Sequence, residues 1–483
     1  MAHPGQTDGL ISALNDRRSN PFIRTRQRVR YDRRAAFRVG SSALAFLHDG
    51  DHIVSGFLKN ISDTGVCVAL EGMPREADTG SVTVSIPVLL GRHIRCELCW
   101  SRNGQGNTFI CGLNFLDLPV ESTRTLRKRL LLKESLLMSY ADEITAKTRD
   151  VQVRQSIKGF FLIDVRMALD GLITMDSMVM NGGRDGEISR QCAETLDALA
   201  DAGHELELII EDAALIKEVK QRVRTLLGQF LYQSRNFKRG LEKPRGYPGD
   251  YKMLEMVYDE HDYSRGLGKY IDRYGLEQPY AVGIRLRKDK MKNILYDFIN
   301  SSKDEQLNIL NLASGACRDI TELFNLPMRF AGKVALTCVE QDEEAIQYSK
   351  NQLELVDTGT VDVRFVQGNI LRLEELAVGA DGSYDLVYSI GIADYLQDRM
   401  LKKILQDSYR MLKKGGTLVI AYKDKEKHTP LALNWYADWS FVPRNEQELV
   451  ALIRDAMGAD NICVSIDRQD TGIIFFAEIT KQQ

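Results

Sequence analysis

The pattern of apolar and polar positions divides the chain into stretches of different character. Between about residue 36 and residue 118, short apolar runs alternate with turn-forming groups such as SDTG and NGQGN. Short runs with regular turn signals are typical of strands in a small barrel or sandwich. We therefore predict an all-β domain with strands at SALAFL, IVSGFLKNI, VCVALE, SVTVSIPVLL, HIRCELCWS and TFICGLNFLDL.

The period of the pattern changes near Pro119. The segment STRTLRKRLLLKESLLMSYADEITAKTRD places apolar residues at helical spacing, with charged residues on the opposite face. This spacing indicates amphipathic helices. Helical patterns continue to about residue 240 and are interrupted by NGGRDGE at 181–187. The region predicts a helical connector that is also a candidate surface for a homodimer.

After residue 300, strand-like and helix-like segments alternate. LNILNLAS, KVALTCVEQD, VDVRFVQGN, YDLVYSIG and GGTLVIAYK are strand-like, and helical patterns separate most of them. This order predicts a parallel sheet covered by helices on both faces, which is an α/β Rossmann-like fold. The last segment, NICVSIDRQDTGIIFFAEIT, predicts two antiparallel strands that close the edge of the sheet.

Composition and charge narrow the function classes. The chain has 483 residues, 44% apolar and 27% charged, which suits a soluble protein of about two to four domains. Its net charge of −3 gives no whole-chain attraction to nucleic acid or to an acidic membrane. No apolar run of 18 residues occurs, so the sequence predicts no ordinary membrane span.

The cysteines predict neither disulfides nor a metal site. Eight are scattered along the chain, and the single CxxC pair, Cys96 and Cys99, lies in a strand-like run without a second pair at zinc spacing. Buried thiols are the better interpretation. Together with a first segment that lacks the pattern of a secretory signal, they predict a cytoplasmic protein.

The first 38 residues differ from the rest because they hold nine Arg against three Asp. Such an arm is either solvated or binds phosphate. It contains RxxxR at Arg34–Arg38, and after 21 intervening residues comes an NxSxxG motif that begins at Asn60. Together the motifs resemble the PilZ domain, a receptor for cyclic di-GMP, over about residues 24–118, with Gly112 near the end of the barrel. The resemblance implies ligand-binding roles for Arg33, Arg34, Arg38, Asn60, Ser62 and Gly65.

The chemistry of these residues suits that ligand. A guanidinium group can bind phosphate oxygens or the O6/N7 edge of guanine through two hydrogen bonds, and it can stack on a purine. Asn60 and Ser62 offer short polar groups to a second guanine edge, and Gly65 permits a tight turn after them. The alternative is a solvated basic arm beside an unrelated turn.

A second set of motifs begins with ILNLASGACRDI. It is similar to the glycine-rich first loop of class I S-adenosylmethionine-dependent methyltransferases, where the backbone passes close to the cofactor. Asn311 stands where an acidic residue is common, and Ala313, Gly315 and Cys317 take the three glycine positions. Small residues at these positions could also serve packing alone. The candidate cofactor-binding residues that the resemblance implies are Asn311, Ala313, Ser314 and Gly315.

The following strands extend the resemblance. Glu340 ends the next strand, 25 residues after Gly315, where a carboxylate can accept both ribose hydroxyls of a nucleoside cofactor. Asp342 is a second candidate or a helix cap. A dinucleotide oxidoreductase is the rival on this fold, but GxGxxG is absent. The resemblance implies cofactor contacts from Glu340, Gln341, Asn369, Ile370 and Ser389.

Two missing motifs and one further resemblance indicate the class of methyl acceptor. The proline-rich motif of amino methyltransferases that act on bases is absent after the fourth strand, as is a ProCys nucleophile, so we expect no nucleic-acid substrate. RGYPGDY and the segment that follows are similar to bacterial biosynthesis proteins for the extracellular factor 3-hydroxypalmitic acid methyl ester, over about residues 225–480. This resemblance implies a fatty-acid carboxylate as the methyl acceptor. The candidate catalytic residues are Tyr247, Asp250, Asp394 and Tyr395. The alternative is that RGYPGDY is a plain Pro-Gly turn between helices.

A carboxylate acceptor makes the chemistry simple. With a typical pKa of about 4 it is ionised at neutral pH and needs no general base. Placement in line with the methyl group and exclusion of water would supply most of the rate. Arg285 or Arg287 could orient a carboxylate of the substrate or of the cofactor. An amine or hydroxyl acceptor would need a base, for which His428 and Asp394 are candidates.

The sequence thus predicts a multidomain protein with a basic arm over 1–30, a PilZ-like β-barrel over 31–118, a helical connector over 119–240 and a methyltransferase with an N-terminal helical cap over 241–483. The expected function is methyl transfer from S-adenosylmethionine under the control of cyclic di-GMP. The rival hypothesis is an adaptor that responds to cyclic di-GMP through a degenerate methyltransferase fold. Asn311, Ala313 and Cys317 favour the rival, whereas Glu340 argues against it.

Overall fold

The computed structural model divides into two compact units. The first, called the barrel unit, comprises residues 39–238 and 262–274, and the second, called the sheet unit, comprises residues 239–261 and 275–482. Helices α9 (Arg235–Glu242) and α11 (Leu267–Glu277) each belong partly to one unit and partly to the other. The structure describes residues 39–40, 44–49, 52–61, 64–71, 81–86, 93–104, 108–359, 361–458 and 462–482.

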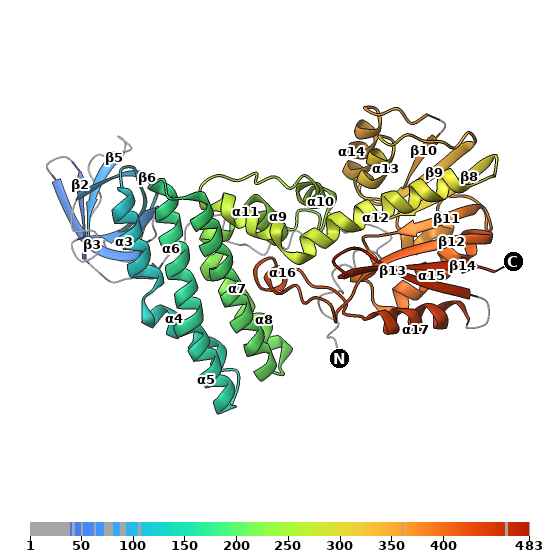
Figure 1. Cartoon of the computed structure of the whole chain (residues 1–483). Helices are drawn as coiled ribbons and strands as arrows, with labels where there is room; N and C mark the ends of the chain where they lie inside the picture. The colour runs from blue at the N-terminus through green and yellow to red at the C-terminus, as the bar shows by residue number, and fades with distance from the viewer. Residues whose placement is uncertain are drawn as a thin grey trace. The chain divides into compact units, whose positions relative to one another are not determined.

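The barrel unit begins with antiparallel strands that close on themselves (Figure 1). Their order is β3-β2-β5-β6-β7-β4, and β4 pairs again with β3, so a closed six-stranded barrel forms; β1 adds to β3. Alternate side chains fill the interior, and Leu126 from the following helix is fully buried among them. The predicted β-barrel is confirmed. Its strands are β1 (Val39–Gly40), β2 (Leu44–Asp49), β3 (His52–Ile61), β4 (Gly65–Leu70), β5 (Ser81–Ser85), β6 (His93–Asn103) and β7 (Phe109–Phe115).

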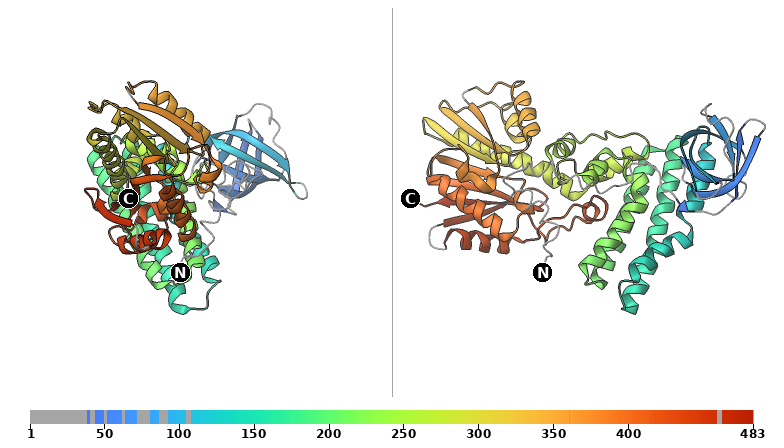
Figure 2. Two further views of the ribbon diagram at one scale, coloured as in Figure 1. Left: turned by 90° about the vertical axis from the view of Figure 1, so that its right-hand side faces the viewer. Right: turned by 180° about the vertical axis from the view of Figure 1, so that it is seen from behind.

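Helices make up the rest of the barrel unit, as the amphipathic pattern predicts (Figure 2). The predicted break falls between Met180, which ends α6, and Asp185, which begins α7. Helices α5 and α6 run on through the π-helical turn η1, a local widening of the helix. The helices are α3 (Val120–Leu131), α4 (Glu134–Thr145), α5 (Val151–Phe160), η1 (Phe161–Val165), α6 (Arg166–Met180), α7 (Asp185–Ile209) and α8 (Ala213–Leu231).

The sheet unit is built on a seven-stranded sheet in the order β10-β9-β8-β11-β12-β14-β13. The first five strands in this order are parallel, and β14 pairs antiparallel with both β12 and β13. The prediction that the last two strands form an antiparallel pair at the edge of the sheet is confirmed: β14 lies beside β12, and β13 is the outermost strand. The strands are β8 (Gln306–Leu312), β9 (Lys333–Glu340), β10 (Val361–Gln367), β11 (Tyr384–Ser389), β12 (Leu412–Lys423), β13 (Ile462–Arg468) and β14 (Ile474–Lys481).

Two apolar cores cover the two faces of this sheet, which explains why its strands are continuous apolar runs. Helix α12 packs Met291 and Leu295 into one core, and helices α15 and α17 pack Leu405 and Leu449 into the other. The predicted Rossmann-like fold is confirmed. The helical elements are α10 (Tyr251–Tyr258), α12 (Pro279–Ser301), α13 (Arg318–Leu323), α14 (Glu343–Leu353), η2 (Ile370–Glu375), η3 (Ala393–Tyr395), α15 (Asp398–Met411), α16 (Leu431–Tyr436) and α17 (Glu446–Met457).

The topology of the sheet locates the site. The chain moves outward from β8 to β9 and β10, and then returns to the other side of β8 with β11. Ligands of such sheets bind at this reversal, beyond the carboxyl ends of the strands. In the part of the chain that the structure describes, no helix combines the length and the hydropathy that crossing a bilayer requires.

Candidate functional site

The loop after β8 has an unusual backbone. Ala313, Gly315 and Cys317, at the three predicted glycine positions, all have positive φ angles, of 55°, 56° and 51°. Only glycine adopts this region without strain, and yet two of the three residues carry a side chain. A Cβ atom placed on Gly315 would have no neighbour within 4 Å. The loop therefore leaves open space beside the Gly315 backbone, where a ligand can approach.

Glu340 at the end of β9 holds this loop in place. Its Oε2 atom accepts a hydrogen bond from the Gly315 amide at 2.8 Å. Its Oε1 atom accepts from the amides of Gln341 and Asp342, at 2.7 and 2.9 Å. Burial raises the pKa of this carboxyl, and the three amide bonds oppose the rise. A carboxylate has about four acceptor positions, so one remains for a hydroxyl group of a ligand.

The other predicted cofactor residues lie at the carboxyl ends of neighbouring strands. Ser389 ends β11 and donates a hydrogen bond to the Leu312 carbonyl at 2.8 Å, while Asn311 is buried on β8. Asn369 caps η2 by accepting from the Leu371 amide at 2.9 Å. The Ser314 hydroxyl is buried and has no hydrogen-bond partner among the described residues.

These features fit a nucleoside cofactor. The open space at Gly315, the orphaned Ser314 hydroxyl and the remaining acceptor position of Glu340 lie on one short loop and the strand beside it. Together they offer a cradle and polar partners for a ribose and its substituents. S-adenosylmethionine would supply an electrophilic methyl group there.

The RGYPGDY segment lies against this loop. Arg245 forms ion pairs with Glu344 and, at 3.2 Å, with Asp342, which caps α14. Tyr251 is buried in a small apolar cluster with Ala316 of the loop and Ala345 of α14. The segment thus contacts both the loop after β8 and Asp342, two residues after Glu340.

The Asp250 carboxylate caps a helix and pairs with an arginine. It is fully buried and caps α10 by accepting from the Met253 amide at 2.9 Å. Arg239 binds both of its oxygens, at 2.8 and 2.7 Å. A carboxylate with three such partners is held in place, with both of its oxygens occupied. The sequence did not reveal Arg239, because a pair 11 residues apart across a turn has no local pattern.

Tyr247 lies close to the carboxylates of the site. Burial raises its pKa well above the usual value, and the nearby Glu340, Asp250 and Asp342 raise it further. Its hydroxyl is therefore protonated at neutral pH.

Asp394 and Tyr395 lie on η3, directly after β11. The Asp394 carboxylate is buried, accepts a hydrogen bond from the Lys423 amide at 2.7 Å, and has a pKa raised by burial. The Tyr395 hydroxyl accepts from the Trp439 indole at 2.8 Å. A side chain on Gly249 of the RGYPGDY segment would collide with Trp439 and approach the Tyr395 hydroxyl. The structure thus brings Tyr395 and this segment together.

An aromatic cluster that the sequence did not reveal surrounds Tyr395. The Phe441 ring lies 5.4 Å from the Tyr395 ring, 4.9 Å from the Tyr280 ring and 6.1 Å from the Trp439 ring. These residues come from α12, η3 and the segment after α16, so no local spacing links them. Ring pairs at these distances form a rigid apolar wall beside Asp394.

A buried acid lies behind the loop. Asp319, in the first turn of α13, accepts a hydrogen bond from the Tyr388 hydroxyl at 2.9 Å and is almost fully buried. Burial raises its pKa to about 6. Part of its population is therefore protonated near neutral pH.

The barrel motif is partly described. Arg33, Arg34, Arg38 and Ser62 lie outside the described residues. Val39 and Gly40, which follow Arg38 directly in the sequence, pair with Ile61 and Asn60. The described backbone therefore leads from the end of RxxxR to the start of the second motif. The Asn60 side-chain oxygen is buried and without a hydrogen-bond partner among the described residues.

The role expected for Gly65 needs a correction. Its φ angle is not positive, and it lies in β4 opposite Asn114 of β7. A Cβ atom here would come within 2.2 Å of the Leu113 carbonyl oxygen. Glycine is needed because two strands approach closely, and not because of a tight turn. Gly112 has a similar reason, because the Trp100 ring occupies the space beside it.

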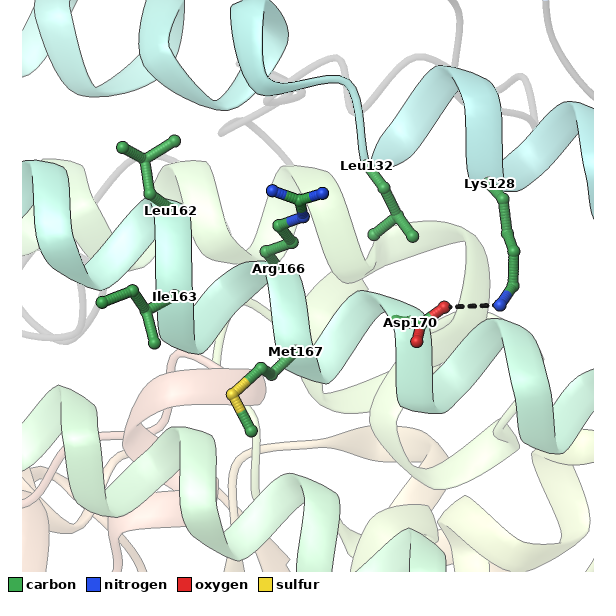
Figure 3. A pocket seen from close by; sticks show the side chains of 7 residues that line it. All are labelled: Lys128, Leu132, Leu162, Ile163, Arg166, Met167 and Asp170. Atoms are coloured by element: carbon green, nitrogen blue, oxygen red, sulfur yellow. Dashed lines mark ion pairs between the residues drawn. The ribbon is translucent and has the colours of Figure 1, made fainter.

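A surface groove of about 360 Å³ lies between α3 and α6 of the barrel unit (Figure 3). Ile163 and Met167 line it with more than half of their surface exposed, and Lys128 forms an ion pair with Asp170 at 2.7 Å along one side. None of the lining residues belongs to the ligand-binding motifs. Among the described residues, no three His, Cys, Asp or Glu side chains gather as metal ligands would.

Comparisons with known families support both predicted domains, the PilZ domain and the methyltransferase domain. A methyltransferase domain model matches residues 303–472, and a PilZ domain model matches residues 32–132. The chain therefore contains a PilZ domain and an S-adenosylmethionine-dependent methyltransferase domain. The resemblance to the 3-hydroxypalmitic acid methyl ester family stays a prediction.

Individual relatives are more distant. The ribosomal protein L11 methyltransferase of Thermosipho melanesiensis is 23% identical over 171 residues, which are 35% of this chain. The chain spans 57% of the length of that relative. A methyltransferase structure from Aquifex aeolicus is 16% identical and covers 43% of this chain and 95% of its own, with a TM-score of 0.30. A protein of Bordetella parapertussis is 14% identical and covers 66% and 97%, with a TM-score of 0.40.

Proposed function

We propose that this protein is a methyltransferase, regulated by cyclic di-GMP, that transfers the methyl group of S-adenosylmethionine to the oxygen of a small acyl carboxylate. The observation that carries the proposal is the presence of a PilZ domain and a methyltransferase domain in one chain. The open cradle at Gly315 beside Glu340 supports cofactor binding. A cytoplasmic location stays a prediction.

The state of the acidic side chains supports a carboxylate acceptor. Asp250 is occupied by Arg239 and by a helix terminus, and Asp394 already accepts the Lys423 amide. Neither is well placed to remove a proton, and a carboxylate acceptor needs no such step. The aromatic wall around Phe441 suits an apolar acceptor body.

An acceptor that needs a base remains an alternative. His428 is half-buried rather than fully exposed, and burial lowers its pKa to about 4, so its ring is neutral at pH 7. A neutral imidazole can accept a proton. His428→Gln should leave carboxylate methylation unchanged, and a loss of activity in this variant would favour an amine or hydroxyl acceptor.

The central experiment compares wild type with Glu340→Ala and Glu340→Gln. Calorimetry should show S-adenosylmethionine binding to wild type and an affinity lower by about 1–3 kcal/mol in Glu340→Ala, because charged hydrogen bonds are lost. Glu340→Gln should lie between them, since it keeps one acceptor oxygen. Mass spectrometry of lipid extracts from cells with and without the protein should then reveal the methyl ester. Absence of cofactor binding would favour the adaptor hypothesis.

A homodimer through the helical region stays part of the proposal. The exposed Ile163 and Met167 in the groove of Figure 3 give it a place to be tested. If two copies associate there, Met167→Glu should convert a dimer into a monomer in light scattering, because a charge would enter an apolar interface. Leu208→Glu, which makes the same kind of change at an exposed apolar residue of α7 outside the groove, is the control.

A further inference from the structure

Arg287 on α12 is a buried cation with unused hydrogen-bonding capacity. Its side chain is 4% exposed, and its Nε–H group has no partner among the described residues. Its Nη1 atom lies 3.9 Å from Asp394 Oδ2, which is an ion pair too long for a hydrogen bond. A buried guanidinium normally saturates its donors, so one left open indicates a missing anionic partner.

The arginine two residues earlier gives an internal comparison. Arg285 donates to the Leu276 carbonyl at 3.0 Å and pairs with Glu260 at 2.8 Å. These partners end or follow the neighbouring helices α11 and α10, so Arg285 ties those segments to α12. At position 285 the guanidinium thus has a carbonyl and a carboxylate as close partners. At position 287 on the same helix it meets the Tyr258 side chain and leaves its Nε–H group without a partner among the described residues.

The residues around Arg287 indicate the chemical class of the missing partner. Tyr280 and Asp394 lie on one side of it, and the aromatic wall of Tyr395 and Phe441 continues from them. A side chain on Gly391 would lie 3.8 Å from the Arg287 Nη2 atom, and Gly391 itself is half-buried. A charged end beside apolar walls fits a molecule with an anionic head and a hydrocarbon body.

We propose that Arg287 is the residue that selects a carboxylate as the methyl acceptor. One oxygen of the acceptor carboxylate accepts hydrogen bonds from the guanidinium, and the other faces the cofactor methyl group. A lone pair of that oxygen forms the new O–CH₃ bond while the S–CH₃ bond breaks and its electron pair stays on sulfur. The products are a methyl ester and S-adenosylhomocysteine, and no proton moves. The inference rests on the proposed function.

The test uses the full-length protein with cyclic di-GMP present. Arg287→Lys keeps the charge but loses the planar pair of donors, and Arg287→Met removes both. Arg285→Lys makes the same change at the engaged position. Dodecanoate is the probe acceptor and dodecanamide is its neutral counterpart. We expect kcat/KM for dodecanoate to fall at least 100-fold in Arg287→Met and about 10-fold or more in Arg287→Lys, while S-adenosylmethionine affinity stays within about 2-fold.

A second measurement separates the two proposals. Binding of dodecanoate in the presence of S-adenosylhomocysteine requires no turnover, and it should be strong in wild type and in Arg285→Lys and weak in both Arg287 variants. Gly391→Val should weaken it too, by filling the space beside the guanidinium, with an unchanged melting temperature as evidence of folding.

The outcomes are distinct. Dodecanoate binding that does not depend on Arg287, or an absence of dodecanoate binding to wild type, overturns the inference. A loss of S-adenosylmethionine affinity in the Arg287 variants would also overturn it, because the guanidinium would then serve the cofactor carboxylate. Dodecanoate binding that depends on Arg287, without turnover of any acceptor, would refute the proposed function and leave the anion site standing.

Discussion

The two ligand-binding motifs of this protein both contain a glycine beside a strand, yet the two glycines serve different needs. Gly65 in the barrel has ordinary backbone angles and is required because the Leu113 carbonyl passes within 2.2 Å of where a Cβ would be. Gly315 in the sheet unit has a φ angle of 56° and open space around it. The barrel glycine serves strand packing, whereas the other shapes a space for a ligand. A glycine in a motif therefore does not by itself identify a contact with the ligand.

The motifs also differ in the kind of charged group that they contain, carboxylates in the sheet unit and arginines in the barrel motif. Glu340 and Asp319 are fixed inside the sheet unit by amide and hydroxyl donors. Arg33, Arg34 and Arg38 of the barrel motif lie outside the described residues, and Val39 and Gly40, which follow them in the sequence, pair with Ile61 and Asn60. Affinity at the barrel should depend on a few arginine side chains, while affinity in the sheet unit should depend on the shape of a loop.

The largest effect is expected from the arginines. Replacing Arg34 and Arg38 together by Ala should weaken cyclic di-GMP binding by about 3–6 kcal/mol, since a hydrogen bond to a charged group contributes about 1.5–3 kcal/mol. Calorimetry measures the loss. Arg17→Ala with Arg18→Ala removes the same charge from the arm outside the motif and should have a much smaller effect. Equal losses in both double variants would assign binding to net charge alone.

Opposite responses to pH should separate the two units. Burial raises the pKa of Asp319 to about 6, so its folded state holds a proton more tightly than the unfolded state. Stability of the sheet unit should therefore fall as the pH rises from about 4 to about 6, by about 3 kcal/mol at most. Burial, with the neighbouring His93, lowers the pKa of His48 in the barrel, so barrel stability should fall as the pH drops below about 6.5.

Tryptophan fluorescence can follow the units separately, because Trp100 lies in the barrel and Trp435 and Trp439 lie in the sheet unit. Melting curves between pH 4.5 and 7 of Trp100→Phe, with and without Asp319→Asn, test the sheet unit. Asp319→Asn should reduce the fall in stability of the sheet unit over this pH range. Parallel pH profiles of the two proteins would show that Asp319 is not the responsible group.

A matched pair of glycine substitutions tests the difference between Gly65 and Gly315 directly. Gly65→Ala should destabilise the barrel by about 1–3 kcal/mol or more, because two backbones must separate. Gly315→Ala should cost about 1–2 kcal/mol of stability through its positive φ, and it should also lower S-adenosylmethionine affinity by placing a methyl group in the open space. Melting temperatures and calorimetry measure both. A normal cofactor affinity in folded Gly315→Ala would remove the cradle from the site.

Coupling between the sites should be no larger than the effect of Gly65→Ala. Helices α9 and α11 each contribute residues to both units. Allosteric coupling is typically about 1–3 kcal/mol, and it must be reciprocal for binding. Calorimetry of each ligand, with and without saturating amounts of the other, measures it. Identical affinities together with identical turnover would leave the PilZ domain as a tether or a localisation device.

The sequence alone determined the elements and the two ligand classes of this protein. Alternating short strands, helical periodicity and βα alternation follow from local spacing, and so does the break between Met180 and Asp185. The ends of parallel strands meet at one edge, so the positions of Gly315, Glu340 and Ser389 relative to one another could be predicted as well.

Tertiary structure alone decided which partners the polar groups of the site have for hydrogen bonds and ion pairs. Arg239 and Asp250, Trp439 and Tyr395, and the contrast between Arg285 and Arg287 depend on segments distant in sequence that pack together. No local spacing encodes such contacts, because they arise when helices and loops settle on the sheet and bury their side chains. Burial then sets the pKa of Asp319, and close approach of two strands sets the need for Gly65.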